Sequence, residues 1–401
     1  MKIGIIREGK VPPDMRVPLT PEQCRLVKER FDAIDVVVQE SPIRAFSDDA
    51  YREQGIKVVS DLSDCDVIMG VKEVQISDLI PNKQFFFFSH TIKEQPYNRE
   101  LLRTVLDRNI RLIDYEVLTT DAGMRVIAFG RWAGIVGAHN GLMAHGQRKG
   151  TFSLPRVGTV KDYNALKKLY NQIDLPPLRI VVTGSGRVAT GAIEVLDHLG
   201  IRQVEPEEYL EHQYAEPVYA QLKIHHLYQR KSDHGFEMQE FFDHPDRYES
   251  IFEPYTKATD LMINAIYWDP NAPIYFTREA MQRPDFSIQT IADITCDIEG
   301  SIPATLRATT IADPVMGYDP ATHQEVEPYQ PHTIDIMSVD NLPNELPRDA
   351  SADFGDQLIE NVWDELIHGK GTMLDRATIA QGGQLGPYFQ YLQGYVKGEQ
   401  K

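Results

Sequence analysis

Short apolar runs alternate with helix-like segments along the first 130 residues. The runs predicted to be strands are Lys2–Ile6, Ile34–Val38, Val67–Val71, Phe85–Phe88 and Ile110–Ile113. Each is apolar on both faces, as expected for strands of a parallel sheet that helices cover on both sides. This region is therefore predicted to be an α/β domain built on a parallel sheet.

Two helices are predicted between these strands. The first begins after Thr20, because Thr20 and Gln23 have capping-box spacing and Pro21 stands at the first helical position. The second contains four apolar residues that recur at helical spacing: Leu101, Leu102, Val105 and Leu106.

Polar residues follow the predicted strands at the points where they end. They are Arg7, Glu8, Lys72, Glu73, Ser89, His90 and Glu116. The carboxyl ends of parallel strands share one edge of a sheet, which is where ligands bind in such folds. An amine, an imidazole and carboxylates at one edge could transfer protons. The alternative is that polarity simply returns as each strand leaves the core.

A second signal lies in the middle of the chain. Leu178–Val182 is predicted to be a strand, followed by a turn with Gly184 and Gly186 and by a helix over Val188–Leu199. This Gly-x-Gly pattern, with Ala189 at the third position, is typical of a turn that binds a dinucleotide pyrophosphate. The alternative is a glycine turn that joins an ordinary strand to a helix.

The residues after this turn extend the prediction of a dinucleotide site. Ile201–Val204 is predicted as the second strand of this domain, and Glu205 follows it near the position expected for an acidic residue on the ribose 2′-hydroxyl. Ser185, Arg187 and Val188 lie within the turn and are also expected to contact the dinucleotide. Because Glu205 would repel a 2′-phosphate, NAD is favoured over NADP.

Residues 206–258 have a looser, polar pattern with several histidines, whose spacing fits no metal site. Further strands are predicted at Leu261–Ile266, Ile288–Ile294 and Thr333–Val339. A last helix is predicted over Ser351–Ile367, with one buried face formed by Phe354, Leu358, Val362 and Leu366.

Composition narrows the class of protein. The chain has 401 residues, a formal net charge of −18 and 42% hydrophobic residues, which is typical of a globular protein and argues against a nucleic-acid or anionic-membrane partner. Its three cysteines, Cys24, Cys65 and Cys296, have no metal-ligand spacing, which favours a reducing compartment. With no signal-peptide pattern at Met1, we expect a cytoplasmic protein.

The expected fold is α/β, with two Rossmann-like doubly wound parallel-sheet domains and a cleft between them. Residues 1–132 and 345–401 are predicted to form a substrate-binding, catalytic domain. Residues 133–344 are predicted to form the dinucleotide-binding domain.

Several motifs resemble a known group of enzymes. Met1–Glu8, Arg16–Pro21 and Val71–Glu73 are similar to the N-terminal domain shared by alanine dehydrogenases, proton-translocating transhydrogenases and lysine-forming saccharopine dehydrogenases. More selective motifs resemble the lysine–2-oxoglutarate reductase half of bifunctional lysine-degrading enzymes: Phe88–Gln95, Leu112–Glu116, Arg125–Gly134, His244–Ser250, Ile263–Trp268 and Ser338–Ala350.

The resemblance implies reversible conversion of saccharopine to L-lysine and 2-oxoglutarate with NAD or NADP. It places the catalytic lysine and histidine at Lys72 and His90. The substrate-binding residues that it implies are Arg16, Glu73, Glu116, Arg125, Phe129 and Asp340, and Ile266 and Tyr267 join the residues expected to bind the dinucleotide. The arginines suit substrate carboxylates and the glutamates suit substrate amines. Small molecules are the expected partners, together with further copies of the chain in a homo-oligomer.

Two other functions remain open at this point. An alanine dehydrogenase would share Lys72 and His90 but act on a smaller substrate, and the motifs around His90 and Phe129 argue against it. A catalytically silent nucleotide-binding module would need none of the charged residues at the predicted sheet edge, so their joint presence favours an enzyme.

Overall fold

The computed structural model describes residues 1–399 and divides the chain into two compact units. The first consists of Met1–Phe129 together with the segment that starts at Pro347, and the second is Gly130–Leu346. The sequence placed the junctions at 132/133 and 344/345, whereas in the structure they lie at 129/130 and 346/347.

The first unit is built on an eight-stranded sheet with the order β18-β17-β6-β5-β4-β1-β2-β3. Its parallel strands are β1 (Lys2–Ile5), β2 (Asp35–Gln39), β3 (Lys57–Val59), β4 (Val67–Met69), β5 (Gln84–Phe87) and β6 (Arg111–Asp114). The chain returns after residue 347 and adds two antiparallel strands, β17 (Thr378–Gln381) and β18 (Gln384–Leu385). The predicted strands are confirmed, but this antiparallel edge was not predicted.

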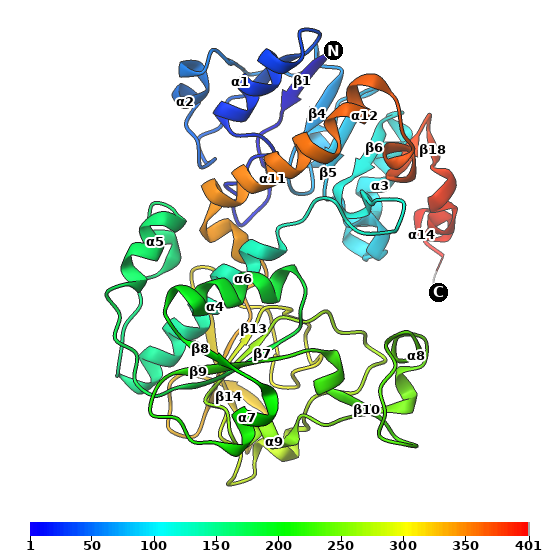
Figure 1. The fold of residues 1–401 in the computed structure, drawn as a ribbon. Helices are drawn as coiled ribbons and strands as arrows, with labels where there is room; N and C mark the ends of the chain where they lie inside the picture. Colours follow the sequence, from blue (N-terminus) through cyan, green and yellow to red (C-terminus); the bar gives the residue numbers. More distant parts are fainter. Residues whose placement is uncertain (400–401) are drawn as a thin grey trace. The chain divides into compact units, whose positions relative to one another are not determined.

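Helices cover both faces of this sheet (Figure 1). They are α1 (Pro21–Arg30), α2 (Asp48–Glu53), α3 (Arg99–Asp107), α11 (Pro347–Asn361), α12 (Trp363–His368), α13 (Met373–Arg376) and α14 (Gln393–Lys397). The predicted capping box is confirmed. The Thr20 hydroxyl accepts from Gln23 N, and the Gln23 side chain accepts from Thr20 N at 3.0 Å. Leu101, Leu102 and Val105 of α3 are buried as predicted.

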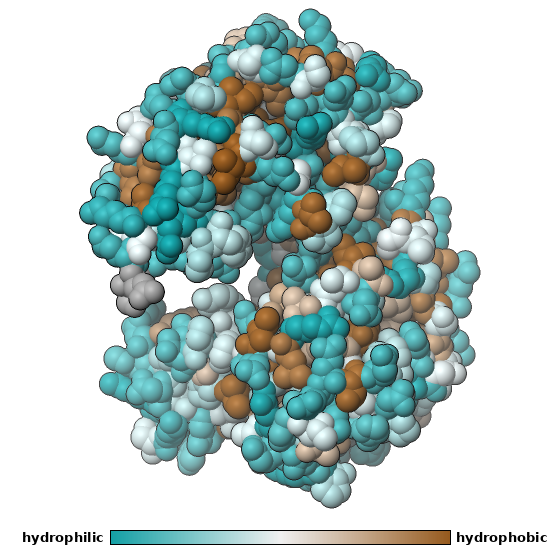
Figure 2. Space-filling model, turned by 180° about the vertical axis from the view of Figure 1, so that it is seen from behind, coloured by the Kyte–Doolittle hydropathy of each residue, from teal (hydrophilic) through white to brown (hydrophobic). Residues whose placement is uncertain are grey.

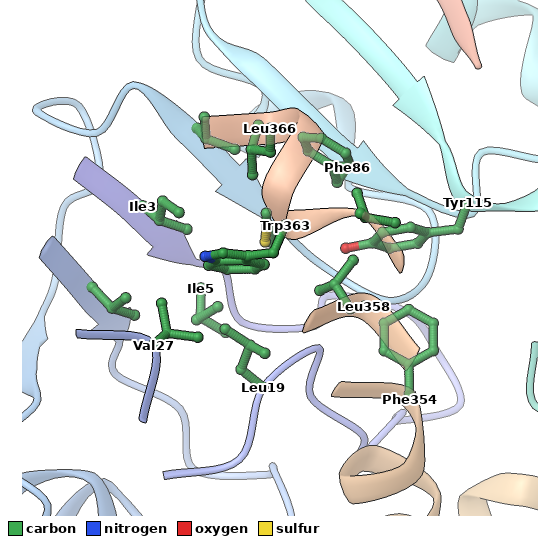
Figure 3. Packing of buried hydrophobic residues seen from close by; sticks show 14 of the residues in the cluster. Ile3, Ile5, Leu19, Val27, Phe86, Tyr115, Phe354, Leu358, Trp363 and Leu366 are labelled. Atoms are coloured by element: carbon green, nitrogen blue, oxygen red, sulfur yellow. The ribbon is translucent and has the colours of Figure 1, made fainter. Parts of the chain in front are cut away.

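The predicted helix over Ser351–Ile367 is broken in two. Val362, with φ −116° and ψ −30°, separates α11 from α12. All four predicted core positions are nevertheless buried. The break places the adjacent Trp363, which is fully buried, in the core among Ile3, Ile5 and Leu358 (Figure 3). A side chain of this size at the break was not part of the predicted apolar stripe.

The second unit has an eight-stranded sheet of its own, with the order β15-β14-β16-β13-β12-β7-β9-β8. Its parallel strands are β7 (Arg179–Thr183), β8 (Arg202–Val204), β9 (Val218–Leu222), β12 (Leu261–Asn264), β13 (Thr290–Asp293) and β16 (Ile334–Met337). The antiparallel edge strands are β14 (Val315–Asp319) and β15 (Gln324–Val326), and a separate hairpin contains β10 (Tyr228–Arg230) and β11 (Tyr248–Ser250).

One feature of this sheet differs from the prediction. A strand that was not predicted, β9, lies between β7 and β8, the second strand of this unit in chain order, so β8 does not pair with β7. β9 comes from the loosely patterned region 206–258, in which no strand was predicted. Its sequence, Val218–Leu222, is short and includes a polar Gln221, so its pattern did not distinguish it from a loop.

The helices of the second unit are α4 (Gly130–Lys149), α5 (Tyr163–Tyr170), α6 (Arg187–His198), α7 (Pro206–Glu211), α8 (Met238–Asp243), α9 (Glu253–Thr256) and α10 (Arg278–Met281). α4 and α6 pack closely, as Figure 1 shows. A Cβ atom at Gly134 would overlap Val188 O, and one at Gly191 would overlap Arg131 O. The small residues of α4 therefore allow backbone-to-backbone contact, as expected for this small-residue-rich stretch.

The surface of the molecule is mixed. On the face shown in Figure 2, hydrophobic side chains lie in small groups among hydrophilic ones. Within residues 1–399, no helix has the length and apolar character needed to cross a membrane. Cys24, Cys65 and Cys296 form no disulfide within residues 1–399.

Candidate active site

The carboxyl edge of the first sheet brings together the charged residues that the sequence singled out. The strand order changes direction between β1 and β4, which is the usual position of a binding crevice in a doubly wound sheet. Glu8 follows β1, and Lys72 and Glu73 follow β4. Direct contacts join these two strand ends.

Glu8 fixes the backbone at Lys72. Its Oε1 accepts from Val71 N at 2.6 Å, and its Oε2 accepts from Lys72 N at 3.0 Å. Burial, with a further contribution from the negative charge of Asp14, raises the pKa of Glu8 to about 8. Sequence analysis noted Glu8 at a strand end but assigned it no role, and only the pairing of β1 with β4 reveals this contact.

Lys72 has the electrostatic environment of a potential base. Burial lowers its pKa to about 8, and the nearby cations Arg16 and Lys10 act in the same direction, while Asp14 and Glu73 oppose the shift. A lysine with this pKa is half neutral near pH 8. The lone pair needed to accept a proton is thus available close to neutral pH.

Glu73 and His90 form a close pair across the ends of β4 and β5. Glu73 Oε1 lies 2.5 Å from His90 Nδ1, and Glu73 Oε2 lies 3.4 Å from Lys10 Nζ. Burial opposes ionisation of Glu73, but the hydrogen bond and charge of His90 outweigh it and hold the pKa of Glu73 at about 2. As a carboxylate, Glu73 accepts a hydrogen bond from Nδ1–H, which leaves Nε2 as the other functional nitrogen of His90.

The turn that carries His90 is fixed by its neighbours. The Asp114 carboxylate at the end of β6 accepts from Ser89 N at 3.0 Å and from Ser89 Oγ at 2.5 Å. Ser89 Oγ also lies 2.8 Å from Thr91 Oγ1. His90 itself has φ +52°, in the left-handed region that is uncommon for a residue with a side chain. Strained backbone of this kind is frequent at functional sites.

Arg16 is buried, and one edge of its guanidinium pairs with a carboxylate of the same chain. Its Nε donates to Asp14 Oδ1 at 3.0 Å and its Nη2 donates to Asp14 Oδ2 at 2.6 Å. The guanidinium carbon lies 4.2 Å from the centre of the Phe129 ring. Since Asp14 occupies this bidentate edge, a substrate carboxylate would have to use the rest of the guanidinium.

One carboxylate oxygen of Glu116 is buried and suited to accept a hydrogen bond from a ligand. Its Oε1 lies 3.4 Å from Lys93 Nζ, whereas its Oε2 is buried and has no hydrogen-bond partner among residues 1–399. A buried carboxylate oxygen without a partner is costly unless a ligand donates to it. Arg125 is exposed, and its guanidinium lies 6.0 Å from the centre of the Phe88 ring.

Aromatic rings lie directly behind these charged groups. Phe88 stacks with the His90 ring at 6.4 Å and contacts Tyr115 and Phe129, and Phe129 stacks on Phe354 of α11 at 4.7 Å. Phe354 was predicted as a core residue, and its place beside Phe129 depends on the return of the chain to the first unit. These rings exclude water from one side of the charged cluster.

The glycine turn of the second unit has the geometry of a phosphate-binding turn. Gly184 has φ +98°, and a Cβ there would lie 2.8 Å from Ala265 O, so no other residue fits. A Cβ at Gly186 would meet nothing within 4 Å. This open space lies at the first turn of α6, where N–H groups can bind a phosphate. The residues of this site therefore fit a dinucleotide.

The other residues predicted for this site lie around the same turn. Ser185 and Arg187 are exposed beside Gly186, and Val188 is half-buried in the first turn of α6. Ile266 and Tyr267 follow β12, which pairs with β7, and Ile266 Cα lies 3.0 Å from the position of a Gly184 Cβ. The structure thus places Ile266 beside the glycine turn, with the exposed Tyr267 as the next residue.

A buried polar network holds the segment after β12 in place. Asn264 accepts from Thr183 Oγ1 at 2.7 Å and donates to Asp293 Oδ1 at 2.9 Å and to Ser301 Oγ at 3.0 Å. These residues were not predicted. Each of β7, β12 and β13 ends in a polar residue, and because the three strands share one edge of the sheet, these residues could have been expected to lie together.

Two predicted residues lie elsewhere. Glu205 is exposed after β8, and β9 separates its strand from β7, so Glu205 is not at the end of the strand that neighbours the glycine strand. Asp340 is exposed after β16 and belongs to the second unit, not to the charged cluster of the first. Within the part of the chain that the structure describes, no group of three or more acidic, histidine or cysteine side chains could hold a metal ion.

Comparison with known proteins gives three findings. A family model described as "Alanine dehydrogenase/PNT, N-terminal domain" matches residues 4–136. An "Alpha-aminoadipic semialdehyde synthase" of Arabidopsis thaliana is 30% identical over 97% of this chain, although the chain spans only 41% of that protein. A "Saccharopine dehydrogenase [NAD(+), L-lysine-forming]" of Candida glabrata is 27% identical over 90% of this chain and 91% of its own length.

The fold comparison agrees with the two-sheet architecture. A solved structure of "L-alanine dehydrogenase" matches 99% of this chain and all of its own with a TM-score of 0.65 at 18% identity. At that identity the similarity shows the fold alone. Together, these findings confirm the family resemblance and the fold class predicted from the sequence.

Proposed function

We propose that this chain, whose residues 4–136 match the model described as "Alanine dehydrogenase/PNT, N-terminal domain", is an oxidoreductase that interconverts saccharopine with L-lysine and 2-oxoglutarate. In the oxidative direction, saccharopine, NAD(P)+ and water give lysine, 2-oxoglutarate, NAD(P)H and a proton. The first unit binds and activates the substrate, and the second unit binds the dinucleotide.

The observation that carries the proposal is the arrangement at the switch point of the first sheet. Lys72 has a pKa of about 8, and its backbone is fixed by Glu8. The next residue, Glu73, is paired with His90 at 2.5 Å. A lysine with a lowered pKa and an imidazole therefore lie on neighbouring strand ends, which suits oxidation of an amine followed by hydrolysis.

Each of these groups has a role in the proposed reaction. The dinucleotide, when bound, supplies a hydride acceptor for the carbon next to the secondary amine. Of Lys72 and His90, one accepts the proton of that amine and the other assists the attack of water on the resulting imine. Glu73 keeps the imidazole oriented by accepting from Nδ1.

The surrounding residues suit the charges of saccharopine, which has three carboxylates and an amino group in addition to its secondary amine. Arg16 and Arg125 supply positive charge beside the aromatic rings of Phe129 and Phe88. The buried Oε2 of Glu116 can accept from a substrate ammonium. Asp340 contributes to substrate binding only if the second unit delivers it to the first.

The glycine turn supports the dinucleotide part of the proposal. The turn over Gly184–Val188 leads into the first turn of α6, where backbone N–H groups and the open space at Gly186 suit a pyrophosphate. Ile266 and Tyr267 follow β12, next to this turn. NAD and NADP are both compatible with these residues. Assembly into a homo-oligomer and a cytoplasmic location stay predictions.

A substrate-matrix assay tests the proposal. The absorbance of the reduced coenzyme is followed with lysine, ornithine or ammonia as amine donor and 2-oxoglutarate or pyruvate as acceptor. Consumption of the reduced coenzyme with lysine and 2-oxoglutarate, and with no other pair, supports the proposed reaction. Consumption of the reduced coenzyme with ammonia and pyruvate, but not with lysine, would instead identify an alanine dehydrogenase. Coenzyme binding without turnover of any pair would indicate a silent nucleotide-binding module.

A further inference from the structure

Lys223 lies next to the glycine turn because of the unusual strand order of the second sheet. β9 pairs directly with β7, with Leu222 opposite Thr183. Gly184 N donates to Leu222 O at 2.8 Å, so the register continues one step past the strands. The next residue of β9, Lys223, is therefore opposite Gly184, the first glycine of the turn.

Backbone geometry places the Lys223 side chain on the same side as the turn. Gln221 Nε2 donates to Gly184 O at 2.9 Å, so the Gln221 side chain reaches the glycine turn. Lys223 has φ −75° and ψ 165°, which continues the extended strand by one residue. Side chains two residues apart in a strand point to the same face. Lys223 is exposed, so its ammonium group can reach a ligand.

Glu205 is placed less favourably for the role predicted from the sequence. Its strand, β8, pairs with β9 through Val204 and Ala220 and is therefore two strands away from β7, roughly 10 Å at ordinary strand spacing. In dinucleotide-binding folds, the side chain that reads the adenosine ribose stands at the end of the strand next to the glycine strand. In this chain, that position belongs to Lys223.

We propose that Lys223 binds the 2′-phosphate of NADP(H) and gives this chain a preference for NADP(H) over NAD(H). The inference rests on the proposed function, because it requires a dinucleotide at the Gly184–Gly186 turn. An ammonium pairs favourably with a phosphate dianion, whereas it gains less from the 2′-hydroxyl of NAD(H). Glu205 and Glu207 lie close enough to affect His226 next to Lys223, so the site also contains negative charge that Lys223 must outweigh.

Binding of NADPH and NADH, each measured by fluorescence titration, tests this inference without depending on turnover. The wild-type chain is expected to bind NADPH at least tenfold more tightly than NADH. Lys223→Ala should weaken NADPH binding about tenfold or more and change NADH binding less than twofold, as expected for loss of a hydrogen bond to a charged group. Lys223→Asp should reverse the preference.

Two further variants serve as controls. Lys168→Ala removes an exposed lysine of α5, which contacts the far end of α6 through Tyr163 and His198, and should change neither affinity. Glu205→Gln should leave the preference for NADPH in place or strengthen it. If Lys223→Ala lowers the unfolding temperature, Lys223→Gln repeats the test with most of the side chain kept.

The outcomes separate this inference from the proposed function. Tighter binding of NADH than NADPH by the wild type, or equal effects of Lys223→Ala on the two coenzymes, would overturn the role of Lys223 and leave the proposed function standing. A gain of NADPH preference in Glu205→Gln from a wild type that prefers NADH would assign the discrimination to Glu205. Failure of both coenzymes to bind would overturn the proposed function as well.

Discussion

Both units have a mainly parallel sheet with polar residues at its carboxyl edge, but the side chains at the two edges differ in their chemistry. At the edge of the first sheet, ionisable groups are held by contacts with one another or with the backbone: Glu8, Asp14, Arg16, Lys72 and the pair of Glu73 with His90. At the edge of the second, glycines leave open space and a network of neutral side chains and one carboxylate holds the segment after β12.

The difference shows how one architecture supports two tasks. Burial, with a smaller contribution from nearby cations, lowers the pKa of Lys72, and the hydrogen bond with His90 outweighs burial to lower that of Glu73, so this edge prepares groups for proton transfer. The edge with glycines offers backbone N–H groups and room, which suits binding of a phosphate without proton transfer. If the comparison is right, substitutions at the first edge change turnover, and substitutions at the second change coenzyme binding.

Lys72→Met should have the largest effect. It keeps the length of the side chain but removes the amine, so saccharopine oxidation should fall by about 10²–10⁴-fold, the usual contribution of a general base. Coenzyme affinity, measured by fluorescence titration, should stay within twofold of the wild type. Loss of coenzyme binding together with activity would contradict the claim that the first edge serves turnover and the second serves coenzyme binding.

The glycine turn allows a matched test at the second edge. Gly186→Ala places a methyl group in open space, so the fold should be unchanged while coenzyme affinity falls at least tenfold. Gly184→Ala meets Ala265 O and an unfavourable φ, and should lower the free energy of unfolding by about 1–3 kcal/mol. Denaturant titrations and coenzyme titrations of both variants check this. Equal loss of stability in the two variants would contradict the account of the turn.

Glu73→Gln tests the electrostatic description of the carboxyl edge of the first sheet. The pKa of Glu73 is about 2 in the folded chain, below its ordinary value of 4.5. The unfolded chain therefore binds more protons between these pH values, so the stability contributed by ionised Glu73 is present above about pH 4.5 and is lost as pH falls toward 2. The substitution should lower the free energy of unfolding by on the order of 2 kcal/mol at pH 6.

Urea unfolding at several pH values measures this dependence. The difference in free energy of unfolding between the wild type and Glu73→Gln should shrink by about 1 kcal/mol between pH 6 and pH 3.5. A difference that stays constant over this range would mean that the carboxylate of Glu73 is not stabilised by His90 in the folded chain.

Glu8→Gln should have the smallest effect of these substitutions. Above about pH 8, where Glu8 is ionised and both its oxygens can accept, the amide of the variant can accept from only one of the two N–H groups, so either Val71 N or Lys72 N loses its partner, at a cost of about 1–2 kcal/mol. Because the backbone of Lys72 would shift, kcat should fall more than KM changes. Steady-state kinetics with saccharopine check this, and an unchanged kcat would contradict a positioning role for Glu8.

Local features of the fold could be predicted from the sequence. The cap at Thr20 depends on residues three apart, and the glycine turn depends on a strand and helix that flank it directly. The candidate residues after β1, β4 and β5 could be gathered at one edge because parallel strands share a direction. Each of these inferences uses only neighbouring residues or a general rule of parallel sheets.

Features that depend on distant pairing could not be predicted. The insertion of β9 between β7 and β8 depends on pairing between strands that are distant in the sequence, and it places Lys223, not Glu205, at the end of the strand beside β7. The pairing of Arg16 with Asp14 depends on the fold of a loop, and the break at Val362 depends on space for Trp363 in the core.

Titration of the Lys72 amine tests the central claim most directly. NMR of the isotope-labelled chain, with the Lys72 signal assigned from the Lys72→Met variant, gives the pKa without any assumption about substrate. Our account predicts a midpoint at about pH 8 in the wild type. A midpoint near the ordinary lysine value of about 10.4 would contradict it, because the amine would then be almost fully protonated at the pH where the base must act.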